Sequence, residues 1–355
     1  MRKVPAILNC VAETSGIQIA GLNLLDRLIV TAHRAGCAPI YLIAKTVPSV
    51  PRARALGIEM TLASEIPELG KPVLLINGAV FVESADIQRV IEERGQLFSA
   101  DDARLPVAMT AGDSVPVRAG KVAVLVTDAT SVREAEHRLW VSLATSADGI
   151  VDRFVNRPLG RYLSKILVHT PFSPNQVSVV STLVGILSGW FFAGGYFILG
   201  ALLLQLSAII DCVDGDLARV LYKESRLGKW LDLVGDQFVH IAVFAGIGFG
   251  LASSDPASPA LALGISAVLG VIISFAAIVR LMQRKNGGRS SVLAKLIDAA
   301  TNRDFSLLVL LLAIAGRLDL FLWMAGIGVH LFWIVAICSQ WQSARSAPAI
   351  SEKSA

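Results

Sequence analysis

The sequence predicts a membrane α-helical bundle of about six transmembrane helices plus an interfacial helix, with an N-terminal cytoplasmic α/β domain. Two observations predict this fold class. Hydrophobic residues make up 54% of the 355 residues and charged residues only 17%, an apolar balance unusual for a soluble protein. The apolar runs gather between residues 175 and 341, whereas residues 1–145 mix charged and apolar runs as a soluble domain does.

We therefore expect an α/β domain over residues 1–145, an interfacial junction helix over 146–174, a transmembrane domain over 175–341 and a polar tail over 342–355. The net charge is +4, and the basic residues cluster beside apolar segments. This favours a membrane surface or a phosphate ligand as partner, and no nucleic acid. The four cysteines have no metal-ligand or redox spacing and fit a reducing compartment.

Within residues 1–145, short β-type runs alternate with helical stretches, which argues for an α/β domain with a largely parallel sheet. The N-terminal apolar run is too short for a signal peptide, so we expect this domain to stay in the cytoplasm. The expected strands and helices are Val4–Val11, Leu22–Arg34, Ile40–Ala44, Val73–Val82, Ile87–Arg94, Val122–Val126 and Val132–Leu143.

The segment Ala20–Arg27, followed by Ala35-Gly36 and the strand from Ile40, is similar to the first βαβ unit of the sugar nucleotidyltransferases. Where that family has a glycine-rich phosphate loop, this chain has Ala12–Gly16, and Asn77 stands where a metal-binding Asp is expected. Without a phosphate cradle or a metal carboxylate, nucleotidyl transfer is not expected here. A structural or regulatory role, or a sensor that binds nucleotide without turnover, remains.

The junction over residues 146–174 places apolar residues such as Ile150, Phe154 and Leu159 near one stripe and basic residues elsewhere. This pattern is typical of a helix lying in the membrane interface, and Pro158 either breaks or restarts it. The alternative is an ordinary amphipathic helix packed under the soluble domain. Ser173 or Asn175 is then positioned to cap the next helix.

Six apolar segments follow. They run over Val177–Gly194, Tyr196–Asp216, Leu227–Ala252, Ala260–Leu281, Phe305–Ala315 and Leu318–Trp341. The fifth is short for a bilayer, whose hydrocarbon core needs about 20 helical residues. Basic residues flank alternate connections, so the positive-inside rule places both termini and the second-to-third loop on the cytoplasmic side of the cell inner membrane.

Acidic residues stand inside this apolar region, where an Asp at the centre of a spanning helix costs roughly 2.5 to 3.5 kcal/mol. Asp211 and Asp214 are three apart and Asp232 and Asp236 are four apart, so each pair occupies one face of its helix. The carboxylates of two such helices can together bind hard divalent cations, and a substrate phosphate then completes the coordination shell of the cations. The pattern predicts a site for a diphosphate-containing substrate.

Eight residues fit the signature D-x2-D-G-x2-A-R-x8-G-x3-D-x3-D without a gap or mismatch: Asp211, Asp214, Gly215, Ala218, Arg219, Gly228, Asp232 and Asp236. At these residues the sequence resembles the CDP-alcohol phosphatidyltransferases. The resemblance implies transfer of a substituted phosphate from a CDP-alcohol to an acceptor hydroxyl, with release of CMP, in phospholipid biosynthesis. It also implies two divalent metal ions, Mg²⁺ or Mn²⁺.

By position in the signature, Asp211 and Asp232 would bridge the two ions, Asp214 would complete the first and Asp236 the second. Asp236 is also the candidate general base for the acceptor hydroxyl. The residues that the resemblance places at the CDP group are Asn175, Ser178, Gly215, Arg219 and Ser225. Asp216 is expected to be a surface partner of a nearby Lys, and His240 a core histidine outside the site.

The acceptor and the donor are left open. Arg280 and Arg303 border the fourth and fifth spans, and Arg303-Asp304 is similar to a position near the acceptor site of family members that use phosphorylated polyols. These arginines suit inositol phosphate or glycerol phosphate, or else are membrane anchors. The junction motif, with Arg153 and Asn156-Arg157-Pro158, is similar to that of di-myo-inositol-phosphate-phosphate synthase type proteins. The donor is accordingly CDP-diacylglycerol or CDP-inositol.

A competing hypothesis is a membrane transporter or channel that uses the acidic cluster for cations, although it would not account for Gly215, Ala218 and Gly228 at their set distances. Homodimers are common in the resembling family. A glycine-rich face with Gly185, Gly189 and Gly194 would allow close contact between helices. The sequence alone does not decide between a monomer and a homodimer.

Overall fold

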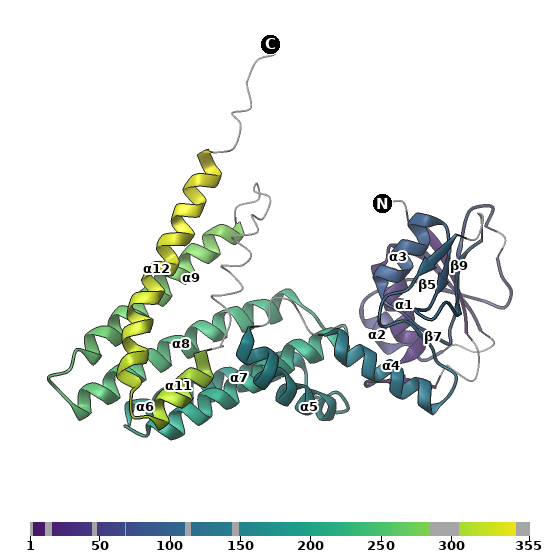
Figure 1. Cartoon of the computed structure of the whole chain (residues 1–355). Helices are drawn as coiled ribbons and strands as arrows, with labels where there is room; N and C mark the ends of the chain where they lie inside the picture. Colours follow the sequence, from purple (N-terminus) through teal and green to yellow (C-terminus); the bar gives the residue numbers. More distant parts are fainter. Residues whose placement is uncertain are drawn as a thin grey trace, which may run out of the picture. The chain divides into compact units, whose positions relative to one another are not determined.

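The computed structural model describes residues 3–10, 16–44, 48–67, 69–110, 115–143, 149–283 and 305–345 (Figure 1), with the side chains of 281–283, 332 and 335–345 left out. Arg303, residues 12–15 and the tail from 346 lie outside the described residues. The chain forms two compact units. The α/β unit comprises Met1–Ala144, Val168–Thr170 and Arg219–Lys223, and the helical unit comprises Thr145–Leu167, Pro171–Ala218 and Glu224–Ala355.

The α/β unit is built on a seven-stranded sheet in the order β10-β8-β9-β6-β1-β4-β5. These strands are β1 (Val4–Asn9), β4 (Cys37–Ile43), β5 (Met60–Ala63), β6 (Leu74–Asn77), β8 (Gln96–Phe98), β9 (Arg104–Met109) and β10 (Pro116–Arg118). β1 runs parallel to β4 and β6, whereas β9 is antiparallel to both of its neighbours. The expectation of a largely parallel sheet is confirmed. The sequence pattern does not predict the antiparallel strand β9.

Short strands and four helices complete the described part of this unit: β2 (Gln18–Ile19), β3 (Leu22–Asn23), β7 (Val80–Phe81), β11 (Val124–Leu125), α1 (Leu24–Arg34), α2 (Pro51–Ala55), α3 (Ser84–Glu93) and α4 (Ala129–Ser142). Helix α1 begins after Asn23, whose side-chain oxygen accepts the N–H of Leu25 at 2.9 Å. The residues Leu25, Leu28 and Ile29 of α1 belong to the same buried core as Leu8 of β1. Helix α1 therefore packs its apolar face against the sheet.

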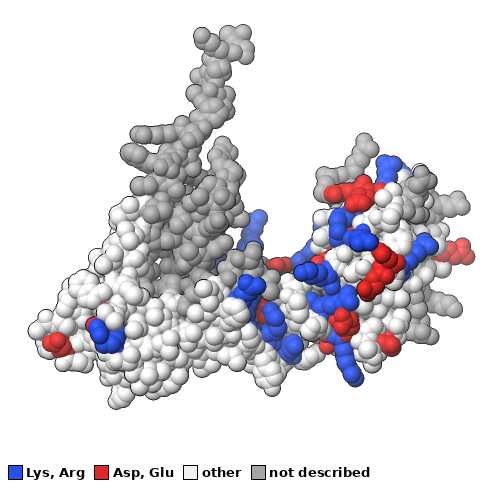
Figure 2. All heavy atoms as spheres, in the orientation of Figure 1, with Lys and Arg blue, Asp and Glu red and all other residues white. Residues whose placement is uncertain are grey.

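The helical unit places a helix on each of the six predicted apolar segments: α6 (Pro174–Ala193), α7 (Phe197–Val220), α8 (Arg226–Ser254), α9 (Ala260–Gln283), α11 (Phe305–Ile314) and α12 (Leu318–Arg345). Among the described residues, four helices are long and apolar enough to cross a membrane: α6, α7, α8 and α9 up to Arg280. The protein is thus a multi-pass membrane protein, and a total of six spans remains a prediction. On the face drawn in Figure 2, charged side chains are frequent on the α/β unit and few on the helical unit.

The junction forms one π-helical turn, Asp152–Asn156, that continues directly into α5 (Arg157–Leu167). Pro158 does not break the helix, because the backbone stays helical from the π-helical turn directly before it through α5. The small residues Gly160 and Ser164 are buried, whereas Ile150 and Phe154 are 77% and 72% exposed. An outward apolar stripe is what a helix in the membrane interface requires.

Helices α6 and α8 approach closely through glycines. A Cβ added at Gly246 would overlap the carbonyl oxygen of Gly189, and one added at Gly189 would lie 2.5 Å from the carbonyl oxygen of Ala242. A Cβ at Gly185 would overlap the side chain of Val239. Gly185 and Gly189 therefore serve contacts within the chain, since small residues let helix backbones meet in a membrane.

We predict that Gly246→Ala destabilises the helical unit by about 1–3 kcal/mol, because the added methyl group meets backbone that cannot move aside. Gly328→Ala is the matched control. It also lies in a helix, α12, but a Cβ there would have no neighbour within 4 Å. Thermal unfolding in detergent, followed by circular dichroism, should show a lower midpoint for Gly246→Ala alone. Equal midpoints for the two variants would contradict the close packing of α6 on α8.

Candidate active site

Three of the four signature aspartates meet between α7 and α8. Carboxylate oxygens of Asp211, Asp214 and Asp232 all lie within 4.8 Å of one another. Asp214 is buried, Asp211 is half-buried and Asp232 is exposed, so the cluster runs from the protein interior to the surface. Like charges at this separation repel strongly, and a divalent cation that prefers oxygen ligands would relieve the repulsion.

Helix α6 supplies hydroxyl groups to the carboxylates on α7. Ser178 donates a hydrogen bond to Asp214 Oδ2, and Ser181 donates one of 3.0 Å to Asp211 Oδ1. Ser181 is fully buried, and its carbonyl oxygen accepts a 2.8 Å bond from Ser207 of α7. The hydroxyls orient two carboxylates toward the cluster, as outer-shell partners do around metal ligands.

Ser181 was not identified from the sequence, because a serine in an apolar helix looks like ordinary packing. Its spacing of three from Ser178 matches that of the two aspartates on α7, and this matching repeat was the available signal. The sequence placed Ser178 at the CDP group, whereas the structure shows its hydroxyl on Asp214 and on the carbonyl of Pro174.

The start of α8 gathers three more residues of the predicted site. Ser225 is the N-cap of α8, and its hydroxyl oxygen accepts the N–H of Gly228 at 2.9 Å. A Cβ at Gly228 would lie 2.9 Å from Oδ1 of Asn175, so the signature glycine leaves room for that side chain. Asn175 lies in the first turn of α6. The N-cap of α6 is Ser173, one of the two predicted caps, and its side chain and backbone exchange hydrogen bonds with Gln176.

The fourth aspartate, Asp236, lies one turn beyond Asp232 on α8 and is 2% exposed. It is not among the three gathered carboxylates. Its place along α8 keeps it on the same face as Asp232. The assignment of Asp236 as second-ion ligand and general base therefore remains a proposal.

Residues 172–344 match the family model described as CDP-alcohol phosphatidyltransferase. This part of the chain belongs to the CDP-alcohol phosphatidyltransferase family. We call residues 172–344 the phosphatidyltransferase domain. Its helices α7 and α8 carry the complete signature, with the three gathered carboxylates at the first, second and third signature aspartates.

A curated relative, "Bifunctional IPC transferase and DIPP synthase" of Aquifex aeolicus, is 35% identical over 109 residues, which cover 30% of this chain and 24% of the relative. Three such bifunctional relatives are matched over only 21% to 31% of their own length. The phosphatidylinositol phosphate synthase of Streptomyces avermitilis is 29% identical over 180 residues, 49% of this chain and 70% of the relative. The crystal structure of Mycobacterium tuberculosis phosphatidylinositol phosphate synthase with CDP-DAG bound shares 18% identity at a TM-score of 0.37, covering 56% of this chain and all of that chain.

Two further residues predicted at the CDP group, and one predicted at the acceptor phosphate, lie on α7 and α9. Gly215 follows Asp214 on α7, and Arg219 is half-buried in the last turn of that helix. Arg280 is exposed in the last turn of α9. Arg303 lies outside the described residues, so the acceptor site stays a prediction.

Asp216 corrects one expectation. It is fully buried, not a surface residue, and its partner is an arginine: Arg157 of α5 lies 3.3 Å from Asp216 Oδ1. The hydroxyl of Ser164 lies 3.5 Å from the other oxygen of the same carboxylate. A buried carboxylate needs such donors, and the sequence pattern did not reveal that α5 would provide them.

His240 is buried beside Phe305, at 5.2 Å between ring centroids, as expected of a core histidine.

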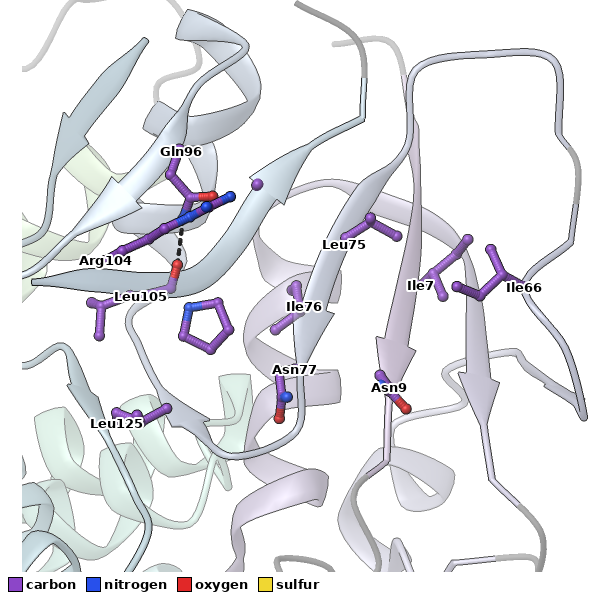
Figure 3. Close-up of a pocket in the computed structure, with 12 residues that line it drawn as sticks. Ile7, Asn9, Ile66, Leu75, Ile76, Asn77, Gln96, Arg104, Leu105 and Leu125 are labelled. Carbon is purple, nitrogen blue, oxygen red and sulfur yellow. Dashed lines mark hydrogen bonds between the residues drawn. The ribbon is translucent and has the colours of Figure 1, made fainter. Parts of the chain in front are cut away.

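A separate pocket of about 570 Å³ lies in the α/β unit (Figure 3). Asn9 and Asn77 stand at its wall where β1 and β6 end, and Arg104 of β9 lies opposite. The side-chain amide nitrogen of Gln96 donates hydrogen bonds to the backbone carbonyl oxygens of Leu105 and Val107. Asn77 Oδ1 accepts the N–H of Ala79 at 2.9 Å and so closes a turn at the position where the resembling family has an Asp. The loss of nucleotidyl transfer stays a prediction.

We predict that Ser178→Ala and Ser181→Ala each weaken divalent-ion binding by about 10- to 100-fold, since outer-shell donors orient the ligands. The matched control is Ser188→Ala. Ser188 is equally buried on the same helix, but its hydroxyl has no hydrogen-bond partner among the described residues. Electron paramagnetic resonance of Mn²⁺ titrated into the purified protein measures the affinity directly. If Ser188→Ala weakened binding as much as Ser181→Ala, the hydroxyl bonds would not orient the carboxylates.

Proposed function

We propose that the chain is a metal-dependent CDP-alcohol phosphotransferase that transfers a substituted phosphate from a CDP-alcohol to an acceptor hydroxyl and releases CMP. The observation that carries the proposal is the meeting of Asp211, Asp214 and Asp232 on α7 and α8 within a domain of the phosphatidyltransferase family. An all-oxygen, anionic donor set fits Mg²⁺ or Mn²⁺. Divalent ions bound there would neutralise charge on the diphosphate.

The residues of the chain then have separate roles. Asp211, Asp214 and Asp232 would hold the ions, and Asp236 would help to hold a second ion and would accept the proton of the acceptor hydroxyl. The acceptor oxygen forms a bond to the phosphorus that bears the alcohol, the bond from that phosphorus to the CMP oxygen breaks, and CMP leaves with the electron pair. Arg219 provides a forked donor for phosphate oxygens, and Asn175, Gly215 and Ser225 border the nucleotide.

The substrates follow from the relatives by analogy alone. Two of them are named phosphatidylinositol phosphate synthase and one archaetidylinositol phosphate synthase. The two phosphatidylinositol phosphate synthase names favour CDP-diacylglycerol as donor and inositol phosphate as acceptor, and the bifunctional relatives keep CDP-inositol as the alternative donor. Arg280 and Arg303 would bind the acceptor phosphate. The phosphatidyltransferase domain would lie in the cell inner membrane with both termini in the cytoplasm, where these water-soluble acceptors are found.

Incubation of the purified protein with CDP-diacylglycerol or CDP-inositol, Mg²⁺ or Mn²⁺, and a panel of alcohols tests the proposal. We expect CMP release, a lipid product with the mass of a phosphatidylinositol phosphate, and loss of both when EDTA removes the metal. A transporter or channel would release no CMP with any donor and acceptor pair. That result would overturn the enzyme hypothesis.

Asp211→Asn, Asp214→Asn and Asp232→Asn should each lower kcat/KM by at least about a hundredfold, because several kcal/mol of transition-state stabilisation depend on the bound metal. Asp319→Asn is the control, since this exposed carboxylate pairs with Arg317 at the start of α12. Initial rates of CMP release at saturating metal provide the measurement. Retention of near wild-type kcat/KM by Asp232→Asn would exclude the proposed ligand set.

A further inference from the structure

The five residues that begin with the signature arginine, in the last turn of α7, fold with the α/β unit. Arg219–Lys223 belong to that unit together with Met1–Ala144. Val220 and Leu221 are buried, and Tyr222 packs against the apolar core of the sheet. The end of the helix that carries Asp211 and Asp214 is thus anchored in the α/β core.

Arg27 of α1 makes the central contact of this anchor. It is 1% exposed, and its guanidinium donates three hydrogen bonds of 2.8 Å to the carbonyl oxygens of Ile19, Ala20 and Val220. Two of these acceptors belong to the β2–β3 hairpin, and the third is the residue directly after Arg219. A buried guanidinium must be matched by acceptors in a fixed geometry, so this contact specifies where Val220 lies.

Tyr222 is held by a second set of contacts in the same unit. Its backbone is left-handed, with φ of +53°, and its hydroxyl lies 3.1 Å from that of Thr31. Its carbonyl oxygen accepts a bond from the guanidinium of Arg52. Arg52 is positioned by Asp26, a fully buried carboxylate that accepts the N–H groups of Arg52 and Ala53 at 2.7 Å. The neighbours Asp26 and Arg27 therefore each support one part of the 219–223 segment.

The same hairpin meets a second segment next to the phosphatidyltransferase domain. Ala20 and Gly21 form its turn with φ values of +45° and +76°. A Cβ at Gly21 would lie 2.6 Å from the carbonyl oxygen of Val168, which belongs to the α/β unit with Thr170. In the chain, α6 and most of α7 lie between these two anchored segments.

We propose that Arg27 is a positioning residue for donor binding: through Val220 it fixes the last turn of α7, so that Arg219 is held ready for the diphosphate of the CDP-alcohol. This inference rests on the proposed function. It gives the α/β unit a task that requires neither a phosphate loop nor a metal carboxylate of its own. It also gives a physical role to the Ala20–Arg27 segment, whose likeness to a nucleotidyltransferase the rest of the site does not use.

Steady-state kinetics of the full chain in detergent, with CDP-diacylglycerol varied, test the proposal. Arg27→Met should raise the donor KM about tenfold and change kcat less than about threefold, because the metal ligands are intact while a charged hydrogen bond to the α7 terminus is lost. Arg27→Lys should recover part of the loss, since an ammonium group reaches fewer of the three carbonyls. Arg118→Met, an exposed arginine of the same unit paired with Asp102, is the control and should match the wild type. An unchanged donor KM in Arg27→Met, or a loss confined to kcat, would overturn the positioning role.

Hydrogen exchange measured by mass spectrometry gives a readout that does not depend on activity. Peptides covering residues 216–226 should exchange at least about tenfold faster in Arg27→Met than in Arg118→Met, because local opening of the α7 terminus becomes easier. Arg52→Met releases Tyr222 without removing the buried guanidinium, so it should show a smaller effect of the same sign even if Arg27→Met folds poorly. Unchanged exchange in Arg52→Met and Arg27→Met would refute the anchor. If the wild type released no CMP, the proposed function and the donor role would both fail, while faster exchange would still establish the anchor itself.

Discussion

Carboxylates placed between apolar helices must find hydrogen-bond donors or cations, and this constraint determines the arrangement of the helical unit. Burying an unpaired charge costs several kcal/mol, which is comparable to the whole stability of a domain. Ser178 and Ser181 of α6 satisfy one oxygen each of Asp214 and Asp211. One carboxylate oxygen of each lies within 4.8 Å of a carboxylate oxygen of Asp232 on α8, where a metal ion is the natural counter-charge.

These hydrogen bonds require α6 to pack closely against its neighbouring helices, and small residues at the contacts allow that close packing. Gly246 lies directly on the backbone of Gly189, and a Cβ at Gly235 would overlap the hydroxyl of Thr182, one turn from Ser178. Larger side chains at these positions would push α6 outward and lengthen the serine–aspartate bonds, whose strength falls steeply with distance. Packing at one end of α6 and charge satisfaction at the other are therefore parts of one requirement.

Much of this could be predicted from the sequence, because apolar length and carboxylate spacing are local signals. The signature placed Asp211, Asp214 and Asp232 together, and the strand and helix alternation gave the α/β unit. Partners distant in the chain were missed. The pairing of Asp216 with Arg157 joins residues 59 apart, and the bond from Arg27 to Val220 joins residues 193 apart. Neither has a periodic pattern, since each depends on how separate elements meet.

The helix α7 is restrained by three kinds of contact along its second half. Hydroxyls of α6 hold Asp211 and Asp214, the guanidinium of Arg157 holds Asp216, and that of Arg27 holds the carbonyl of Val220. Residues 211–220 span about three helical turns, so each turn has its own polar anchor. A metal and diphosphate site benefits from ligands that are already fixed, because little reorganisation then opposes binding. The polar residues of α5 and α7 that lie outside the signature are therefore best understood as supports for the residues within it.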